Sequence, residues 1–273
     1  MSDKVNEFLI NGGIGDFLQC LDAVILLQSS YVEINNKKVP VSDRCKFVVL
    51  SHYPKPQEFF AKFVKTNNFE FHLFSDLDSY IQTIKTCINS ETKIDCPRDS
   101  KFDFSYPYEV ESPFDNHKEI IGIHPFGSSF SSSANKKIGY ADKEISEEAV
   151  RKILRKDKNY LLFGTKNELQ KYADLNKMGN VCLVYHEDIW VSLSHLQICS
   201  KLIAADSSFK TLSLGKGIPT YLIIGNQQDE FRDRYFINPY IDSDTLNLLK
   251  VESPLQCVKD IVDFVNAKVY QSS

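Results

Sequence analysis

The first segment whose residue types could do chemistry is Asn11-Gly12-Gly13-Ile14-Gly15-Asp16, between an apolar run at 8–10 and a predicted helix over 15–29. Glycines at such a junction allow a tight turn and bring a ligand close to backbone N–H groups. Asp16 is either an N-terminal helix residue favoured by the helix dipole, which the spacing alone favours, or a general base facing an interdomain cleft. Leu18 breaks the G-x-G-x-x-G pattern, which argues against a nicotinamide enzyme.

A second segment, His124-Pro125-Phe126-Gly127-Ser128-Ser129, is followed by Lys136 and Lys137. These residue types suit phosphate oxygens, because serine hydroxyls donate hydrogen bonds and lysines supply compact positive charge. The alternative is a solvated serine loop, which the segment by itself favours. His124 is equally compatible with a core histidine.

The third segment, Asp206-Ser207-Ser208-Phe209-Lys210-Thr211, lies where a predicted strand at 202–205 ends and a predicted helix begins. Asp206 or Ser207 caps that helix, or the same N–H groups and the positive end of the helix dipole hold a diphosphate. Capping and anion binding use the same chemistry, so both interpretations stay open.

Composition restricts the class of protein. The 273 residues are 42% hydrophobic and 25% charged, which excludes collagen-like, low-complexity and disordered classes, and the net charge of −4 excludes a globally basic nucleic-acid binder. The seven cysteines form no C-x-x-C pair, so we expect reduced, buried thiols and a cytoplasmic location. No apolar run approaches 18 residues, so no membrane span is expected, and the histidine spacing predicts no metal site.

The elements that must position these segments form two halves of the chain with the same sequence pattern. Short apolar runs alternate with amphipathic stretches before residue 89 and again after residue 118, which predicts two α/β domains with parallel sheets. This alternation is absent from the stretch 89–118, so we expect an N-terminal domain at 1–115 and a C-terminal domain at 116–273. Ligands of such sheets bind at the C-terminal ends of the strands, which is where the three segments lie.

Taken together, the three segments resemble the heptosyltransferases, glycosyltransferase family 9 of the GT-B class. Gly15-Asp16 is similar to the family's G-D opening, and 124–128 with Lys136 is similar to its H-P-G-x-S…K segment. The stretch 162–168 is similar to its strand-G-x-x-x-E segment. The most specific match is 206–220, where the family's spacing from Asp to Pro is preserved without a gap, although Ser and Thr stand at 208 and 211 in place of Gly and His.

The resemblance implies an α/β GT-B fold, with two Rossmann-like parallel-sheet domains facing a cleft and the last helix, over 254–268, packing back on the first domain. It implies a metal-independent glycosyltransferase that moves a sugar from a nucleoside-diphosphate sugar, its co-substrate, to a hydroxyl acceptor of the saccharide or lipopolysaccharide type. No other cofactor is expected. In the family pattern Asp16 is the catalytic base.

The resemblance also assigns the substrate-binding residues. The diphosphate is bound by Ser128, Ser129 and Lys136 or Lys137, the amides at Ser207 and Ser208 neutralise the leaving group, Glu168 takes ribose hydroxyls, and the chain near Glu187 lines the base pocket. Further substrate contacts are expected from Gly13, Gly15, Asp206 and Thr211.

Two alternatives stay open. The first is a phage-type DNA-base glycosyltransferase acting on hydroxymethylated DNA, which needs a basic strip from residues 151–158 or from Arg232 and Arg234. The second is a non-catalytic nucleotide-sugar-binding protein, which the residues at 208 and 211 favour.

Overall fold

The fold is known from a computed structural model, which describes residues 5–34, 37–88, 93–127, 144–225, 246–251 and 264–266. The chain divides into two compact units, Met1–Pro107 and Tyr108–Ser273. The predicted domain boundary, between residues 115 and 116, falls inside the second unit.

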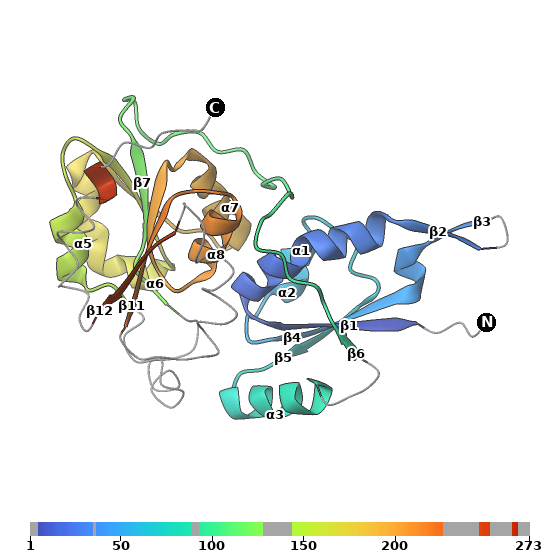
Figure 1. The fold of residues 1–273 in the computed structure, drawn as a ribbon. Coiled ribbons are helices and arrows are strands. Elements are labelled where there is room, and N and C mark those ends of the chain that lie inside the picture. The colour runs from blue at the N-terminus through green and yellow to red at the C-terminus, as the bar shows by residue number, and fades with distance from the viewer. Residues whose placement is uncertain are drawn as a thin grey trace. The chain divides into compact units, whose positions relative to one another are not determined.

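The first unit is built on a four-stranded sheet in the order β5-β4-β1-β6, in which every pairing is parallel (Figure 1). Its strands are β1 (Asn6–Gly12), β4 (Cys45–Ser51), β5 (Phe69–Leu73) and β6 (Lys93–Asp95). Its helices are α1 (Ile14–Ser29), η1 (Val41–Arg44), α2 (Pro56–Phe60) and α3 (Leu77–Ile88). A separate antiparallel hairpin joins β2 (Tyr31–Ile34) to β3 (Lys37–Pro40), and the sequence did not predict it.

Apolar side chains cover both faces of this sheet. Phe17 of α1 contacts Phe60 of α2, which contacts Phe69 of β5. On the opposite face Leu9 and Leu50 pack with Tyr80 of α3. Burying side chains of this size stabilises the fold by about 1.5–3 kcal/mol each, and this packing holds α1 against α2 and α3 against β1 and β4.

The second unit has a six-stranded sheet in the order β12-β11-β10-β7-β8-β9, again with every pairing parallel. Its strands are β7 (Ile120–His124), β8 (Asn159–Phe163), β9 (Val181–Val184), β10 (Lys201–Ala205), β11 (Thr220–Gly225) and β12 (Leu246–Val251). Its helices are α5 (Glu147–Ile153), α6 (Lys166–Leu169), η2 (Gln170–Met178), α7 (Ile189–Ser194), η3 (His195–Ile198) and α8 (Ser208–Gly215).

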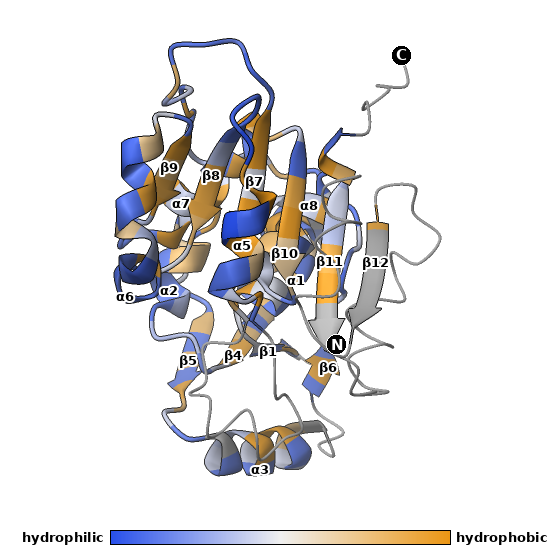
Figure 2. Ribbon diagram, turned by 90° about the vertical axis from the view of Figure 1, so that its left-hand side faces the viewer, coloured by the Kyte–Doolittle hydropathy of each residue, from blue (hydrophilic) through white to orange (hydrophobic). Residues whose placement is uncertain are grey.

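Hydrophobic residues dominate β7, β8, β9 and β10 of the second sheet, as Figure 2 shows. Such continuous apolar runs are typical of parallel strands that are buried on both faces. Ala149 and Val150 of α5 pack with Ile121 and Ile123 on one face, and on the other Phe209 of α8 contacts Phe163. The Ser146 hydroxyl accepts a hydrogen bond from the Ala149 amide and so caps α5.

In each sheet, the direction in which successive strands are added reverses once, and the place of that reversal is the switch point. From β7 the chain moves outward through β8 and β9, then returns to place β10 beside β7 and continues to β11 and β12. In the first sheet it moves from β1 to β4 and β5, then returns to place β6 beside β1. In sheets of this kind ligands bind at the switch point, outside the carboxyl ends of the strands. The two switch points are therefore β1/β6 and β7/β10.

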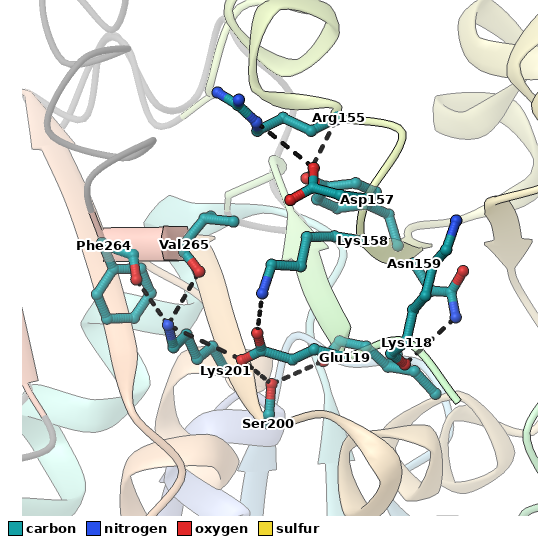
Figure 3. Close-up of polar contacts among 12 residues, drawn as sticks. Lys118, Glu119, Arg155, Asp157, Lys158, Asn159, Ser200, Lys201, Phe264 and Val265 are labelled. Atoms are coloured by element: carbon teal, nitrogen blue, oxygen red, sulfur yellow. Dashed lines mark hydrogen bonds and ion pairs between the residues drawn. The ribbon is translucent and has the colours of Figure 1, made fainter. Parts of the chain in front are cut away.

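The last described residues, 264–266, pack into the core of the second unit, to which they belong. Val265 is fully buried in its core, and Lys201 donates hydrogen bonds to the carbonyls of Phe264 and Val265, at 2.7 and 3.1 Å (Figure 3). The rest of the predicted last helix, with its packing on the first domain, lies outside the described residues. Within the described part of the chain, the helices are too short or too polar to cross a membrane.

Candidate functional site

The switch point of the second sheet brings together two of the segments singled out by sequence. In the parallel register His124, the last residue of β7, lies opposite Ala204 of β10, and Ser207 precedes α8 immediately after that strand. Nδ1 of His124 and Oγ of Ser207 are both buried, and among the described residues neither atom has a hydrogen-bond partner. Buried polar atoms without partners are rare in folded proteins, so two at one switch point indicate a place for a ligand.

His124 is held by aromatic contacts. Its ring stacks on Phe209, with 4.4 Å between centroids, and meets Phe126 edge-on at 6.0 Å. The side chain is 93% buried, and this burial lowers its pKa to about 3. At neutral pH the imidazole is therefore uncharged and acts as a hydrogen-bonding group.

The N-terminus of α8 has no side-chain cap. The backbone of Ser207 is extended there, and its hydroxyl accepts no hydrogen bond from the first turn. The first amides of a helix have no partners within the helix, and together with the helix dipole they attract anions. Of the two interpretations of this segment, capping by a side chain is therefore wrong for Ser207.

Other residues of this segment are engaged within the protein. Asp206 forms an ion pair of 3.1 Å with Lys210, whose side chain is only 1% exposed. The Thr211 hydroxyl is buried and donates to the Ser207 carbonyl at 3.3 Å. Because a hydroxyl has one proton, Thr211 must release this bond before it can donate to a phosphate.

Glu168 lies in α6, which follows β8, and Glu187 lies in the loop between β9 and α7. The Glu168 carboxylate accepts from the Thr165 amide at 2.7 Å and completes the N-terminal capping box of α6. Glu187 is exposed, and its neighbour Asp188 caps α7 by accepting from the Trp190 amide. The predicted diphosphate ligands Ser128, Ser129, Lys136 and Lys137 lie outside the described residues.

The switch point of the first sheet is occupied by an ion pair. Asp16 lies in the first turn of α1, where its Oδ2 accepts from the Gly13 amide at 3.0 Å. Its Oδ1 accepts from Nη1 of Arg98 at 2.5 Å, and Nη2 of Arg98 donates to Oδ1 of Asn11 at 2.8 Å. Arg98 follows β6, so the pair joins the ends of β1 and β6. Sequence reasoning missed Arg98.

Neighbouring side chains leave no room for a Cβ at the glycines before α1. Gly12 has a φ of +127°, and a Cβ there would lie 1.9 Å from Oδ2 of Asp16. A Cβ on Gly13 would lie 2.6 Å from Nε2 of His52. Gly15 lies inside the first turn of α1. The Asp16 carboxylate and the His52 ring thus fill the space next to the first two glycines, and this packing accounts for both without a ligand.

The basic run at 151–158 forms ion pairs. Acidic partners lie within 4 Å of four of its cations, in the pairs Arg151–Asp174, Lys152–Glu148, Arg155–Asp157 and Lys158–Glu119. A cation that already has an acidic partner gains less from a phosphate group. This run therefore gives no support to the DNA alternative, and Arg232 and Arg234 lie outside the described residues.

The described residues contain neither a disulfide nor a cluster of metal ligands. The cysteines at 20, 45, 87, 96, 182 and 199 are free thiols. In the part of the chain that the structure describes, no group of three or more His, Cys, Asp or Glu side chains lies close enough together to hold a metal ion.

Comparison with known proteins bears on the fold. No family model and no curated protein matches the sequence. E. coli ADP-heptose lipopolysaccharide heptosyltransferase II matches with a TM-score of 0.51 and 10% identity, over 96% of this chain and all of that one. E. coli heptosyltransferase WaaC with ADP matches at 0.50 and 9%, over 94% and 96%. A putative UDP-N-acetylglucosamine 2-epimerase from Listeria monocytogenes matches at 0.52 and 10%, over 96% and 89%.

These likenesses confirm the predicted fold class. Two all-parallel sheets with helices on their faces, matched along nearly the whole chain by solved heptosyltransferases, make this a protein of the GT-B fold.

Proposed function

We propose that the chain is a glycosyltransferase that moves a sugar from a nucleoside-diphosphate sugar to a hydroxyl acceptor of the saccharide type. One observation carries the proposal: at the switch point of the second sheet, the uncapped N-terminus of α8 lies beside two buried polar atoms, on His124 and Ser207, that have no partner among the described residues. This combination suits an anionic ligand.

The names of the structural neighbours support the nature of that ligand. The WaaC structure was solved with ADP, and the putative epimerase is named for a UDP-sugar. A nucleoside diphosphate is common to both names, although the reactions differ. The fold therefore supports the class of ligand more strongly than the reaction.

In the proposed complex the diphosphate lies at the N-terminus of α8. The amides of Ser207 and Ser208 and the Ser207 hydroxyl donate to its oxygens, and Ser128, Ser129 and Lys136 or Lys137 add the contacts expected from the sequence. Glu168, in α6, takes ribose hydroxyls, and the loop at Glu187 lines the base pocket. Asp206 holds Lys210 close to this helix end.

The transfer itself requires a base. The acceptor oxygen forms a bond to the anomeric carbon while the bond from that carbon to the diphosphate oxygen breaks, and the electron pair leaves with the diphosphate. Asp16 takes the proton of the acceptor hydroxyl. Each of its carboxylate oxygens accepts a hydrogen bond from the protein and keeps a further lone pair for this role.

Ligand binding is tested by thermal shift with ADP, GDP, UDP, CDP and dTDP on the whole chain. At least one of them should raise the melting temperature, since a ligand that binds only the folded state stabilises it. Ser207→Ala should weaken that binding about tenfold, the value of one hydrogen bond to a charged group. Ser194→Ala is the matched control, because Ser194 also carries a buried hydroxyl without a partner among the described residues, but on α7.

Two results would contradict the donor site: no shift with any of the five nucleotides, or equal affinities for wild type and Ser207→Ala. The non-catalytic alternative rests on Ser208 and Thr211, which stand in place of the Gly and His of the family pattern. It predicts nucleotide binding without release of nucleoside diphosphate from the matching sugar nucleotide.

A further inference from the structure

Arg98 is the group that joins the two sides of the first sheet's switch point. It lies three residues after β6, yet its guanidinium contacts Asn11 at the end of β1 and Asp16 in the first turn of α1. We infer that Arg98 is a positioning residue, which holds the Asp16 carboxylate in the orientation that proton transfer needs. This inference rests on the proposed function, in which Asp16 is the base.

Two separate donors fix the Asp16 carboxylate. The Gly13 amide binds Oδ2 at 3.0 Å and Nη1 of Arg98 binds Oδ1 at 2.5 Å, so rotation of the carboxylate would break at least one bond. The Gly13 amide is part of the backbone at the start of α1, whereas Arg98 reaches Asp16 from the other side of the switch point. Without Arg98, the bond from the Gly13 amide to Oδ2 remains, and the carboxylate can turn about that bond.

Asn11 fixes the guanidinium in turn. Nη2 of Arg98 donates to both the side-chain oxygen and the backbone carbonyl of Asn11, at 2.8 and 3.3 Å. A guanidinium presents its donors in a rigid planar fork, so binding through two nitrogens defines its plane as well as its place. Lysine offers one ammonium group and cannot reproduce both sets of contacts.

The electrostatics keep Arg98 charged. The side chains of Arg98 and Asp16 are only 26% and 14% exposed. Burial alone would lower the pKa of Arg98, but the charge and hydrogen bond of Asp16, together with Cys20 and Asp95, raise the pKa overall. Tyr80 also faces this pair, and burial together with Asp16 raises the pKa of its hydroxyl, so it adds no charge at neutral pH. Arg98 is therefore a permanent cation beside the proposed base.

An arginine that only stabilised the fold would make the same contacts. The test must therefore separate a positioning role from a structural one. The measured quantity is the release of nucleoside diphosphate from ADP-heptose and from the five nucleoside-diphosphate glucoses, with water as the acceptor. Arg98→Ala should lower kcat at least about tenfold, since a displaced catalytic group costs one to two orders of magnitude. The KM for the donor should stay unchanged, because the donor site is placed in the second unit.

Chemical rescue makes the test specific. Methylguanidinium added to Arg98→Ala should restore part of the lost kcat, whereas ammonium at equal ionic strength should not. Asp16→Asn should be inactive and should not respond to either ion. Arg151→Ala is the matched control, because Arg151 also forms an ion pair through its guanidinium, with Asp174 in the second unit, and its loss should leave kcat unchanged.

The outcomes separate the inference from the proposed function. If Asp16→Asn is inactive while Arg98→Ala has the kcat of the wild type, the positioning role is wrong and the proposed function stands. If Asp16→Asn is fully active, or if no sugar nucleotide is turned over by the wild type, the proposed function is wrong and the inference fails with it. Should Arg98→Ala fail to fold, Arg98→Lys decides: a lowered kcat at unchanged KM supports positioning, and the wild-type kcat overturns it.

Discussion

The imidazole of His124 and the ring of Phe209 stack at the second switch point, with their centroids 4.4 Å apart. The stack joins the end of β7 to the first turn of α8, so it ties together the two elements that form the proposed donor site. It also buries a titratable group, so the stability of the fold should depend measurably on pH.

We predict that His124 destabilises the fold in acid. Burial lowers the pKa of His124 to about 3 from the ordinary value of 6.5, so the unfolded chain binds the proton first as the pH falls. The stability due to neutral His124 is complete above pH 6.5 and is lost between there and pH 3, by about 1.4 kcal/mol per pH unit. Urea unfolding of wild type and His124→Phe from pH 7 to pH 4 measures this.

The variant should lose stability less steeply, because phenylalanine keeps the stacking on Phe209 and does not titrate. His117→Phe, which replaces an exposed histidine, is the control and should follow the wild type. Parallel curves for wild type and His124→Phe would show that His124 is not buried in a neutral form.

A second prediction concerns Lys201, which is 2% exposed and donates to the carbonyls of Phe264 and Val265. Lys201→Met keeps the apolar stem but removes two charge-assisted hydrogen bonds, so it should destabilise the protein by about 2–4 kcal/mol in urea unfolding. Glu119 keeps its contacts with Lys158 and Ser200.

Lys152→Met is the matched control for Lys201→Met. Lys152 pairs with Glu148 on the surface, where both side chains are more than half exposed, and such pairs contribute at most about 1 kcal/mol. If the two variants unfold at the same urea concentration, the contacts of Lys201 with the end of the chain contribute nothing to stability.

The second sheet could be predicted from sequence because its strands are continuous apolar runs. The predicted strand at 202–205 agrees with β10, Lys201–Ala205, to within one residue at each end. The switch point follows from the order of these strands along the sheet, which a list of strands does not give. Its consequence, the approach of His124 to Ser207, needed the structure.

The first switch point could not be predicted for a different reason. Strand β6 has three residues of mixed polarity, Lys93–Asp95, and it lies in the stretch 89–118, where the alternation that predicts strands and helices is absent. Without β6 beside β1 there is no reason to place Arg98 next to Asp16, which is 82 residues earlier. The sequence singles out the glycines at 12 and 13 for contact with a ligand, whereas packing against side chains of the protein itself accounts for both.

A third prediction tests that packing. Gly12→Ala should destabilise the protein by more than about 2 kcal/mol, because the residue has a positive φ and its Cβ would lie 1.9 Å from Asp16. Gly179→Ala has a positive φ of 61° but no atom within 4 Å of its Cβ, so it should cost only about 1 kcal/mol. Equal losses in urea unfolding would show that the contact with Asp16 has no energetic effect.

The last prediction concerns DNA as an acceptor. Binding to a polyanion releases counterions for every phosphate neutralised, so its affinity falls steeply as salt rises. The cations at 151, 152, 155 and 158 already have acidic partners, so we expect weak binding of duplex DNA containing hydroxymethylcytosine. Fluorescence anisotropy at about 50 and 200 mM salt should show less than a tenfold change in affinity. A change of a thousandfold or more would require a basic surface elsewhere in the chain, and it would revive the DNA-base transferase against the saccharide acceptor proposed above.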